Sequence, residues 1–249
     1  MRPCIVGSCR QGALRGRADL VHDLRGLGLR AGDTVLVHSA LSTVGSVANG
    51  AETMVSALSE VLGPSGTLVM RTSTPHDARA STSSSAQCTA PVFGVGVLAE
   101  TVRTRSAALH SAHPRSAFTA LGAQADYITS DPSPGCSLGQ DSPLGRQEKL
   151  DARVLLMGVG FEAFTAFHLA EYRITSRLTG PHVSAETLLG SSPFAAVGAS
   201  YEATGAVRSG RVGHAHCRLF DLADAVASAV GQLTGRAAEG APTRTARRQ

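Results

Sequence analysis

The chain has 249 residues, of which 43% are hydrophobic and 17% charged, and its formal net charge is +4. This balance is typical of a soluble globular protein and too apolar for a disordered chain. Its apolar runs are far shorter than the ~20 residues that cross a membrane, and its first residues lack the apolar stretch of a secretory signal, so we expect a cytoplasmic protein. The five cysteines are odd in number and lack CxxC spacing, which argues against a disulfide framework and against a structural zinc site.

The first part of the chain predicts alternating helices and strands. Apolar residues at helical spacing indicate a helix over residues 17–30 and another over 51–62. Short apolar runs at 34–37 and 67–70 predict buried strands, and the first of them leads into a polar turn at 38–42. A strand, a helix and a strand within about 40 residues form a βαβ unit, so at least part of the sheet should be parallel.

The rest of the chain continues this alternation after a long polar stretch. Residues 73–91 are rich in Ser, Thr, Ala and Pro and lack periodicity, which predicts a surface loop. The elements expected after it are a helix at 94–105, a strand at 153–157, a helix at 164–176, a strand at 212–219 and a closing helix at 221–233.

No internal repeat or linker divides the chain, which predicts one α/β domain over residues 1–235 with a mixed, partly parallel β-sheet flanked by helices. Residues 236–249 hold four of the arginines and are expected to be a disordered basic tail: Arg236, Arg244, Arg247 and Arg248. With no Trp, three Tyr and seven Phe, the chain offers no aromatic stacking platform, so we do not expect nucleic-acid binding.

Three polar segments follow predicted strands or helices and are candidates for a binding site, because open α/β sheets bind ligands at the ends of their strands. The segment 38–45 offers hydroxyl and backbone N–H groups, as an anionic or carbonyl ligand would require, although a capping turn has the same composition. The other two segments are 110–114 and 167–173.

Within the last segment, His168 and Glu171 are three residues apart and would share one face of a helix. A carboxylate beside an imidazole can orient it and stabilise its charged form, which suits a general base. The simpler alternative is an ordinary contact on a helix surface. A metalloprotease motif is excluded because HExxH needs a second histidine, and we expect no metal site.

Other candidate residues have weaker support. His113 precedes a proline and is explained by an extended turn. His214 and His216 would share one side of a strand, but two histidines without a third ligand are typical surface residues. Cys88 and Cys136 lie in predicted loops with no local base, so neither is favoured as a nucleophile.

Taken together, these segments resemble the aminoglycoside 3-N-acetyltransferase family, the antibiotic N-acetyltransferases whose fold is unrelated to the common GNAT fold. Each matching fragment is short, but all follow the family's order over roughly residues 30–235. The fragments are Gly32–Ser42, Gly63–Met70, Gly96–Glu100, His113–Pro114, Phe118–Gly122, Asp141–Leu144, Val154–Gly160, His168–Arg173 and Gly210–Gly213.

The resemblance implies an antibiotic N-acetyltransferase-like fold and transfer of an acetyl group from acetyl-CoA to an amine of an aminoglycoside, without an acyl-enzyme. His168 matches the family's catalytic histidine, and Glu171 lies beside it in the same motif. A positioned base contributes ~10²–10⁴-fold to such a reaction. By the same resemblance, six residues would hold the pantetheine arm and thioester of coenzyme A: His38, Ser39, Ser42, Ser111, His113 and Ser116. The oligomeric state stays open, with a homodimer as one hypothesis.

The chain also departs from the family pattern. The family usually has a longer, acidic and Trp-rich segment before Gly96, whereas residues 73–99 here contain Asp77 as their single acidic residue. The region after Arg173 is also shortened. Ala117 stands where the family's HPxxSF motif has serine, with Ser116 one position early. Two alternatives therefore remain: the same fold acting on a smaller or less cationic amine in secondary-metabolite biosynthesis, and a non-catalytic binding protein.

Overall fold

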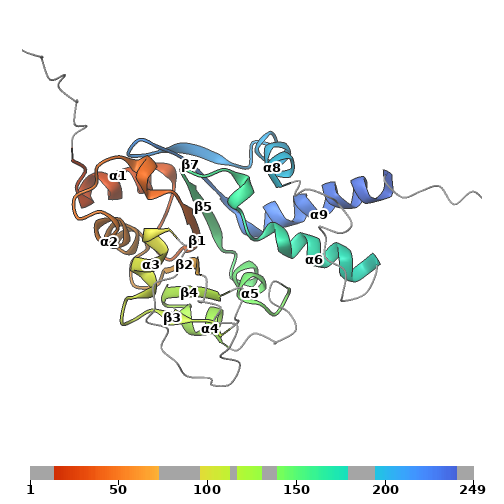
Figure 1. Ribbon diagram of the computed structural model, residues 1–249, viewed down its shortest axis with the longest axis horizontal. Coiled ribbons are helices and arrows are strands. Elements are labelled where there is room, and N and C mark those ends of the chain that lie inside the picture. The colour runs from red at the N-terminus through yellow and green to blue at the C-terminus, as the bar shows by residue number, and fades with distance from the viewer. Residues whose placement is uncertain (1–13, 73–95, 113–116, 131–138, 179–193, 240–249) are drawn as a thin grey trace, which may run out of the picture.

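The computed structural model of the chain describes residues 14–72, 96–112, 117–130, 139–178 and 194–239 (Figure 1). These residues form a seven-stranded sheet with the order β3-β4-β2-β1-β5-β7-β6. Its strands are β1 Thr34–Ser39, β2 Thr67–Thr72, β3 Leu109–His110, β4 Ala117–Gly122, β5 Arg153–Met157, β6 Arg208–Val212 and β7 Ala215–Asp221. The α-helices are α1 Arg17–Leu27, α2 Ala51–Leu62, α3 Val97–Arg103, α4 Ala125–Thr129, α5 Pro143–Lys149, α6 Phe167–Leu178, α8 Phe194–Glu202 and α9 Leu222–Glu239, and the short 3-10 helices are η1 Leu41–Val44 and η2 Phe161–Ala163.

Strand β1 is the centre of the sheet and runs parallel to both of its neighbours. Val37 pairs with Met70 of β2 on one side and with Leu155 of β5 on the other. The pairs β2–β4, β3–β4, β5–β7 and β6–β7 are antiparallel. The sheet is therefore mixed and partly parallel, as the sequence predicts.

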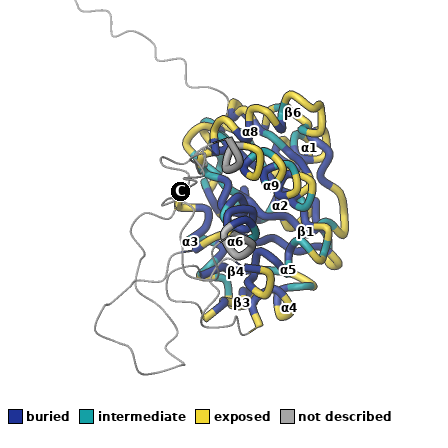
Figure 2. Tube along the Cα trace, turned by 90° about the vertical axis from the view of Figure 1, so that its right-hand side faces the viewer, coloured by how far each residue is buried: buried dark blue, intermediate teal, exposed yellow. Residues whose placement is uncertain are grey.

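Two layers of helices bury the two faces of the sheet, since successive strand residues point to opposite sides. Val35 and Val37 pack in one apolar cluster with α1, α2 and α3, whereas Leu36 packs in the other with residues of α4, α5, α6, α8 and α9. In Figure 1 the first group of helices lies to the left of the central strands, and α6, α8 and α9 lie to the right. Figure 2 shows the buried segments in the interior and exposed ones on the outer turns.

Several elements match the sequence predictions closely. Helix α2 and strand β5 have the predicted bounds, 51–62 and 153–157. Helix α1 ends at Leu27, because Gly28 takes a left-handed conformation with φ of 112° and caps it. The predicted helices at 94–105 and 164–176 begin at Val97 and Phe167. The expected surface loop at 73–91 lies outside the described residues.

Two predictions about the end of the chain differ from the structure in their bounds. The strand expected at 212–219 is present as β7 from 215 to 221, whereas Val212 ends β6, because Gly213, with φ of 61°, turns the chain between the two strands. The closing helix does not stop at 233 but continues to Glu239, so Arg236 belongs to α9 and not to a tail. Residues 240–249 are outside the described part. Among the described helices, none is both long and apolar enough to cross a bilayer.

A close approach between Gly158 and Thr43 fixes η1 against the end of β5. Gly158 has φ of 69°, and a Cβ atom there would overlap the Thr43 hydroxyl. Gly205 has a similar φ of 81° but no atom within 4 Å of its Cβ position. Any L side chain would therefore strain the backbone at both positions. Of the two, only Gly158 would also lack space for the added Cβ atom.

We expect Gly205→Ala to lower the free energy of unfolding by about 1–2 kcal/mol, the cost of a left-handed alanine. Gly158→Ala should lower it by a further ~1–3 kcal/mol, because the Thr43 side chain must move. Urea denaturation of both variants measures the difference. Equal losses of stability would contradict a steric role for Gly158.

Candidate active site

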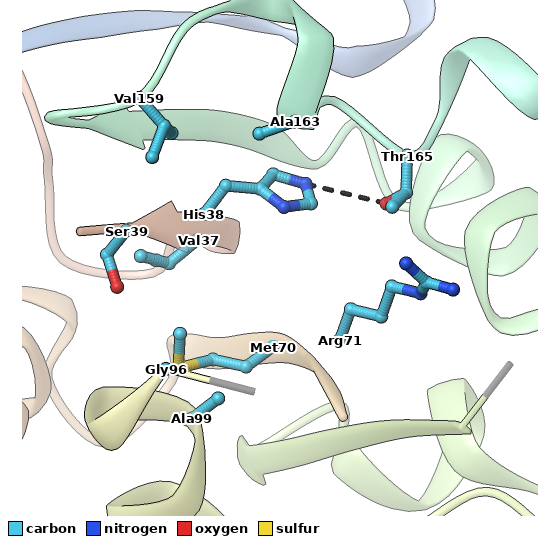
Figure 3. Close-up of a pocket in the computed structure, with 10 residues that line it drawn as sticks. All are labelled: Val37, His38, Ser39, Met70, Arg71, Gly96, Ala99, Val159, Ala163 and Thr165. Atoms are coloured by element: carbon cyan, nitrogen blue, oxygen red, sulfur yellow. Dashed lines mark hydrogen bonds between the residues drawn. The ribbon is translucent and has the colours of Figure 1, made fainter. Parts of the chain in front are cut away.

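A cleft of about 280 Å³ opens at the carboxyl ends of β1 and β2 and beside the segment that follows β5. The chain leaves β1 through α2 to reach β2 on one side, and β5 pairs on the other side of β1. Connections that diverge in this way create the crevice in which open α/β sheets bind ligands. Its lining residues are Val37, His38, Ser39, Met70, Arg71, Gly96, Ala99, Val159, Ala163 and Thr165 (Figure 3).

His38 forms one wall of this cleft. Its ring lies nearly perpendicular to the ring of Phe164, and its Nε2 atom is 3.5 Å from the Thr165 hydroxyl, a long hydrogen bond. Burial, and secondarily the positive charge of Arg71, lower the pKa of His38 to about 4. The ring is therefore neutral at neutral pH and presents one donor and one acceptor nitrogen.

Arg71 lies beside His38, because Val37 and Met70 are paired neighbours in parallel strands. Strand alternation points Arg71 to the face that carries His38, and the side chain is exposed. Figure 3 shows its guanidinium group directed toward the side of the cleft where Thr165 lies. Of the residues that line the described cleft, Arg71 is the one with a permanently charged side chain.

The predicted pair of His168 and Glu171 is present in the first turns of α6. The His168 Nδ1 atom is 2.6 Å from Glu171 Oε2, and the Glu171 side chain is 11% exposed against 41% for His168. The edge of the His168 ring also meets Phe194 of α8, with ring centroids 4.9 Å apart. An ionised carboxylate accepts only, so it favours a hydrogen on Nδ1 and leaves the lone pair of the neutral imidazole on Nε2.

One turn of chain connects this pair to the cleft. The His168 backbone N–H donates to the Thr165 carbonyl at 3.1 Å, and Thr165 itself lines the cleft and contacts His38. His168 is not among the lining residues within the described part of the chain. The first turn of α6 therefore extends from the cleft wall to the histidine–glutamate pair.

The remaining predicted coenzyme A residues are placed differently. Ser39 lines the cleft at the end of β1, and Ser42 is exposed in η1. Ser111 is buried, and its hydroxyl accepts a hydrogen bond from the Phe118 backbone N–H at 2.9 Å. His113 and Ser116 lie outside the described residues. The ligand roles of all these residues stay predictions.

The sequence reading missed Arg71 and Thr165 as site residues. Arg71 directly follows the predicted strand at 67–70, which was a signal that its side chain could reach the strand end. Thr165 gave no signal of its own, because its contact with His38 spans 127 positions of sequence.

Other reactive side chains of the described part lie away from this cleft. Cys217 is buried in β7, and burial raises the pKa of its thiol to about 11, so it is not a nucleophile at neutral pH. Cys88 and Cys136 are outside the described residues. His214 lies in the turn before β7 and His216 within that strand, both exposed, and no three potential ligands within the described ranges are grouped to hold a metal ion.

The pKa of His38 predicts a pH-dependent stability. Because the folded pKa of about 4 is below the ordinary value of 6.5, the unfolded chain binds a proton first as the pH falls. The contribution of His38 is therefore complete above pH 6.5 and is lost between pH 6.5 and 4. Relative to His38→Gln, the wild type should lose on the order of 2–3 kcal/mol of unfolding free energy across this range.

Urea unfolding at several pH values between 7 and 4 measures this loss, and His216→Gln, at an exposed strand position, is the matched control. If the stabilities of the wild type and His38→Gln ran parallel with pH, the proposed cause of the shift would be wrong.

Comparison with known proteins places this geometry in a family. The family model for aminoglycoside 3-N-acetyltransferase matches residues 36–234. An aminoglycoside N(3)-acetyltransferase IV from Salmonella is 35% identical, with 87% of each chain covered. AAC-IIIb in a binary complex with CoASH superposes with a TM-score of 0.78 and 26% identity, covering 90% of this chain and 98% of that one. AAC-VIa bound to sisomicin superposes with a TM-score of 0.79 and 28% identity, covering 90% of this chain and 99% of that one. The chain belongs to the aminoglycoside 3-N-acetyltransferase family, acyltransferases that use acetyl-CoA as co-substrate.

Proposed function

We propose that this protein moves the acetyl group of acetyl-CoA to an amine of an aminoglycoside-type acceptor, with His168 as the general base. The observation that carries the proposal is the 2.6 Å contact between His168 Nδ1 and Glu171 Oε2, which directs the basic lone pair to Nε2. Two neighbours in structure support the ligand classes, since AAC-IIIb is seen with CoASH and AAC-VIa with sisomicin.

In this mechanism His168 removes a proton from the acceptor's ammonium group, which is protonated near neutral pH and cannot attack a thioester. The freed nitrogen bonds to the acetyl carbon as the carbon–sulfur bond breaks, and the imidazolium returns its proton to the leaving sulfur. The nitrogen releases its second proton to solvent as the neutral amide forms. Glu171 stabilises the imidazolium between these two transfers and holds the ring in place. No covalent intermediate on the protein is needed.

The cleft beside α6 would take the reacting end of acetyl-CoA. Its volume of about 280 Å³ is near the lower limit of roughly 300 Å³ for small-molecule pockets, so it suits a thioester end or one sugar ring and not a whole coenzyme A. His38 and Ser39, which line it, and the hydroxyl of Ser42 nearby in sequence would contact the pantetheine arm. By the family resemblance, Ser111, His113 and Ser116 would also contact coenzyme A.

A second candidate keeps this chemistry but changes the acceptor to a smaller or less cationic amine, such as an intermediate of secondary-metabolite biosynthesis. The observation in its favour is the charge of the cleft, since its described lining includes Arg71 and no Asp or Glu. A polycationic sugar is normally bound by carboxylates. A non-catalytic binding protein would give no calorimetric signal with coenzyme A and would release no thiol.

His168→Ala should lower kcat for acetyl transfer by ~10²–10⁴-fold, the usual contribution of a positioned base. Release of free thiol from acetyl-CoA, followed with a thiol reagent and a panel that includes sisomicin, measures this. His216→Ala, which removes an exposed histidine from β7, should leave the rate unchanged. Full turnover by His168→Ala would exclude the base assignment, and no thiol release by the wild type across the panel would exclude the aminoglycoside acceptor.

Glu171→Gln should reduce kcat by at least about tenfold, because an amide can donate to Nδ1 and favour the wrong tautomer. The KM for acetyl-CoA and the thermal midpoint should change little, since the substitution keeps the volume of the side chain and Glu171 is not among the lining residues of the described cleft. Glu60→Gln, at the exposed Glu60 of α2, is the control. A rise in KM with an unchanged kcat would show that Glu171 acts in binding and not through His168.

A further inference from the structure

We propose that Arg71 makes this cleft a site for an amine acceptor that also carries an anionic group, a carboxylate or a phosphate. The inference rests on the proposed acetyl transfer to an amine and specifies the second candidate acceptor, the smaller or less cationic amine.

The position of Arg71 gives it access to a molecule in the cleft. It lies at the carboxyl end of β2, next to His38 at the end of β1, and both strand ends line the cavity. The side chain is exposed, and its guanidinium group is directed toward the side of the cleft where Thr165 lies (Figure 3). A guanidinium group offers five N–H donors in one plane and binds carboxylates and phosphates through paired hydrogen bonds.

The surroundings leave the charge of Arg71 uncompensated within the described lining. None of the other nine lining residues is Asp or Glu. His38 is neutral at physiological pH, because burial and the nearby Arg71 lower its pKa to about 4. The sequence that follows this strand is also poor in carboxylates, since Asp77 is the single acidic residue between positions 73 and 99.

A fixed positive charge in a partly enclosed cleft repels a polycation and attracts an anion, and the effect is stronger there than in open water. Thr165, at the start of the segment that leads to His168, lies on the side of the cleft toward which Arg71 points. The anionic group of an acceptor held at Arg71 would therefore lie on the side of the cleft from which α6 extends.

Coenzyme A also carries phosphates, and these are the second source of an anion for Arg71. The small volume of the cleft favours the acceptor, because the cavity has room for the thioester end of coenzyme A and not for its nucleotide end. The experiment separates the two sources.

The test uses two acceptors that share one amine, D-glucosamine and D-glucosamine 6-phosphate, and compares the wild type with Arg71→Gln and Arg71→Glu. Calorimetry should give at least tenfold tighter binding of the phosphorylated sugar to the wild type, and a ratio near one for Arg71→Gln. Arg71→Glu should bind sisomicin at least tenfold more tightly than the wild type does. Arg30→Gln is the charge-matched control, because the exposed Arg30 precedes the amino end of β1, whereas the cleft lies at its carboxyl end.

Kinetics with two acetyl donors identify the partner of Arg71. S-acetyl-N-acetylcysteamine has the thioester of acetyl-CoA without any phosphate. Arg71 would bind the donor, and the proposal would be overturned, if Arg71→Gln raised the KM for acetyl-CoA but not for S-acetyl-N-acetylcysteamine. In that case the preference for D-glucosamine 6-phosphate over D-glucosamine would stay unchanged. Absence of binding of either sugar, or equal binding of both to the wild type, would overturn it as well. Absence of thiol release with a retained binding preference would instead refute the acetyl transfer and leave the role of Arg71 standing.

Discussion

The parallel pairing of β1 with both β2 and β5 is the constraint on which the site depends. It brings the carboxyl ends of β1, β2 and β5 together at one end of the sheet, where the connecting segments diverge to opposite faces. His38, Arg71 and Val159 come from three different parts of the sequence and meet in the cleft for this reason alone. Two apolar layers hold the three strands in register, since a shift of one residue would turn His38 into the core of α1, α2 and α3.

The site has two parts, a histidine–glutamate pair on a packed helix and a cleft lined by strand ends and turns. The histidine–glutamate pair stands on α6, whose first residue, Phe167, packs against Phe164, and Phe164 in turn packs against Phe220 of β7. A base held on a packed helix keeps its direction while ligands exchange, as an acid–base catalyst requires. The cleft itself is lined by strand ends and turns, where side chains vary at little cost to the core.

The elements that the sequence predicts well are those whose signals are local. Residues 153–157 form an apolar run closed by Gly158, and 51–62 have one apolar face bounded by glycines, so both bounds match. The strand predicted at 212–219 begins too early because its apolar pattern continues across the turn at Gly213, which separates Val212 of β6 from the start of β7. Strand β4 was not predicted from 117–122, since its pairing with β2 is antiparallel and depends on distant residues.

The same distinction applies to the site. The spacing of His168 and Glu171 on one helix is readable from sequence, and their contact is present. The neighbourhood of His38, Arg71 and Thr165 needed the order of the strands, which no local pattern contains. The neutral state of His38 likewise follows from its three-dimensional surroundings.

The fit between Gly158 and Thr43 has a consequence for how this enzyme can diversify. The turn after β1 is locked against the end of β5 with no space for a further carbon atom, so substitutions there would disturb two segments at once. The end of β2, in contrast, carries the exposed side chain of Arg71 at the lining of the cleft, with no close packing to disturb. Evolution of new acceptor ranges should therefore proceed through position 71 and its neighbours, while the turn on the other side of the crevice stays constant.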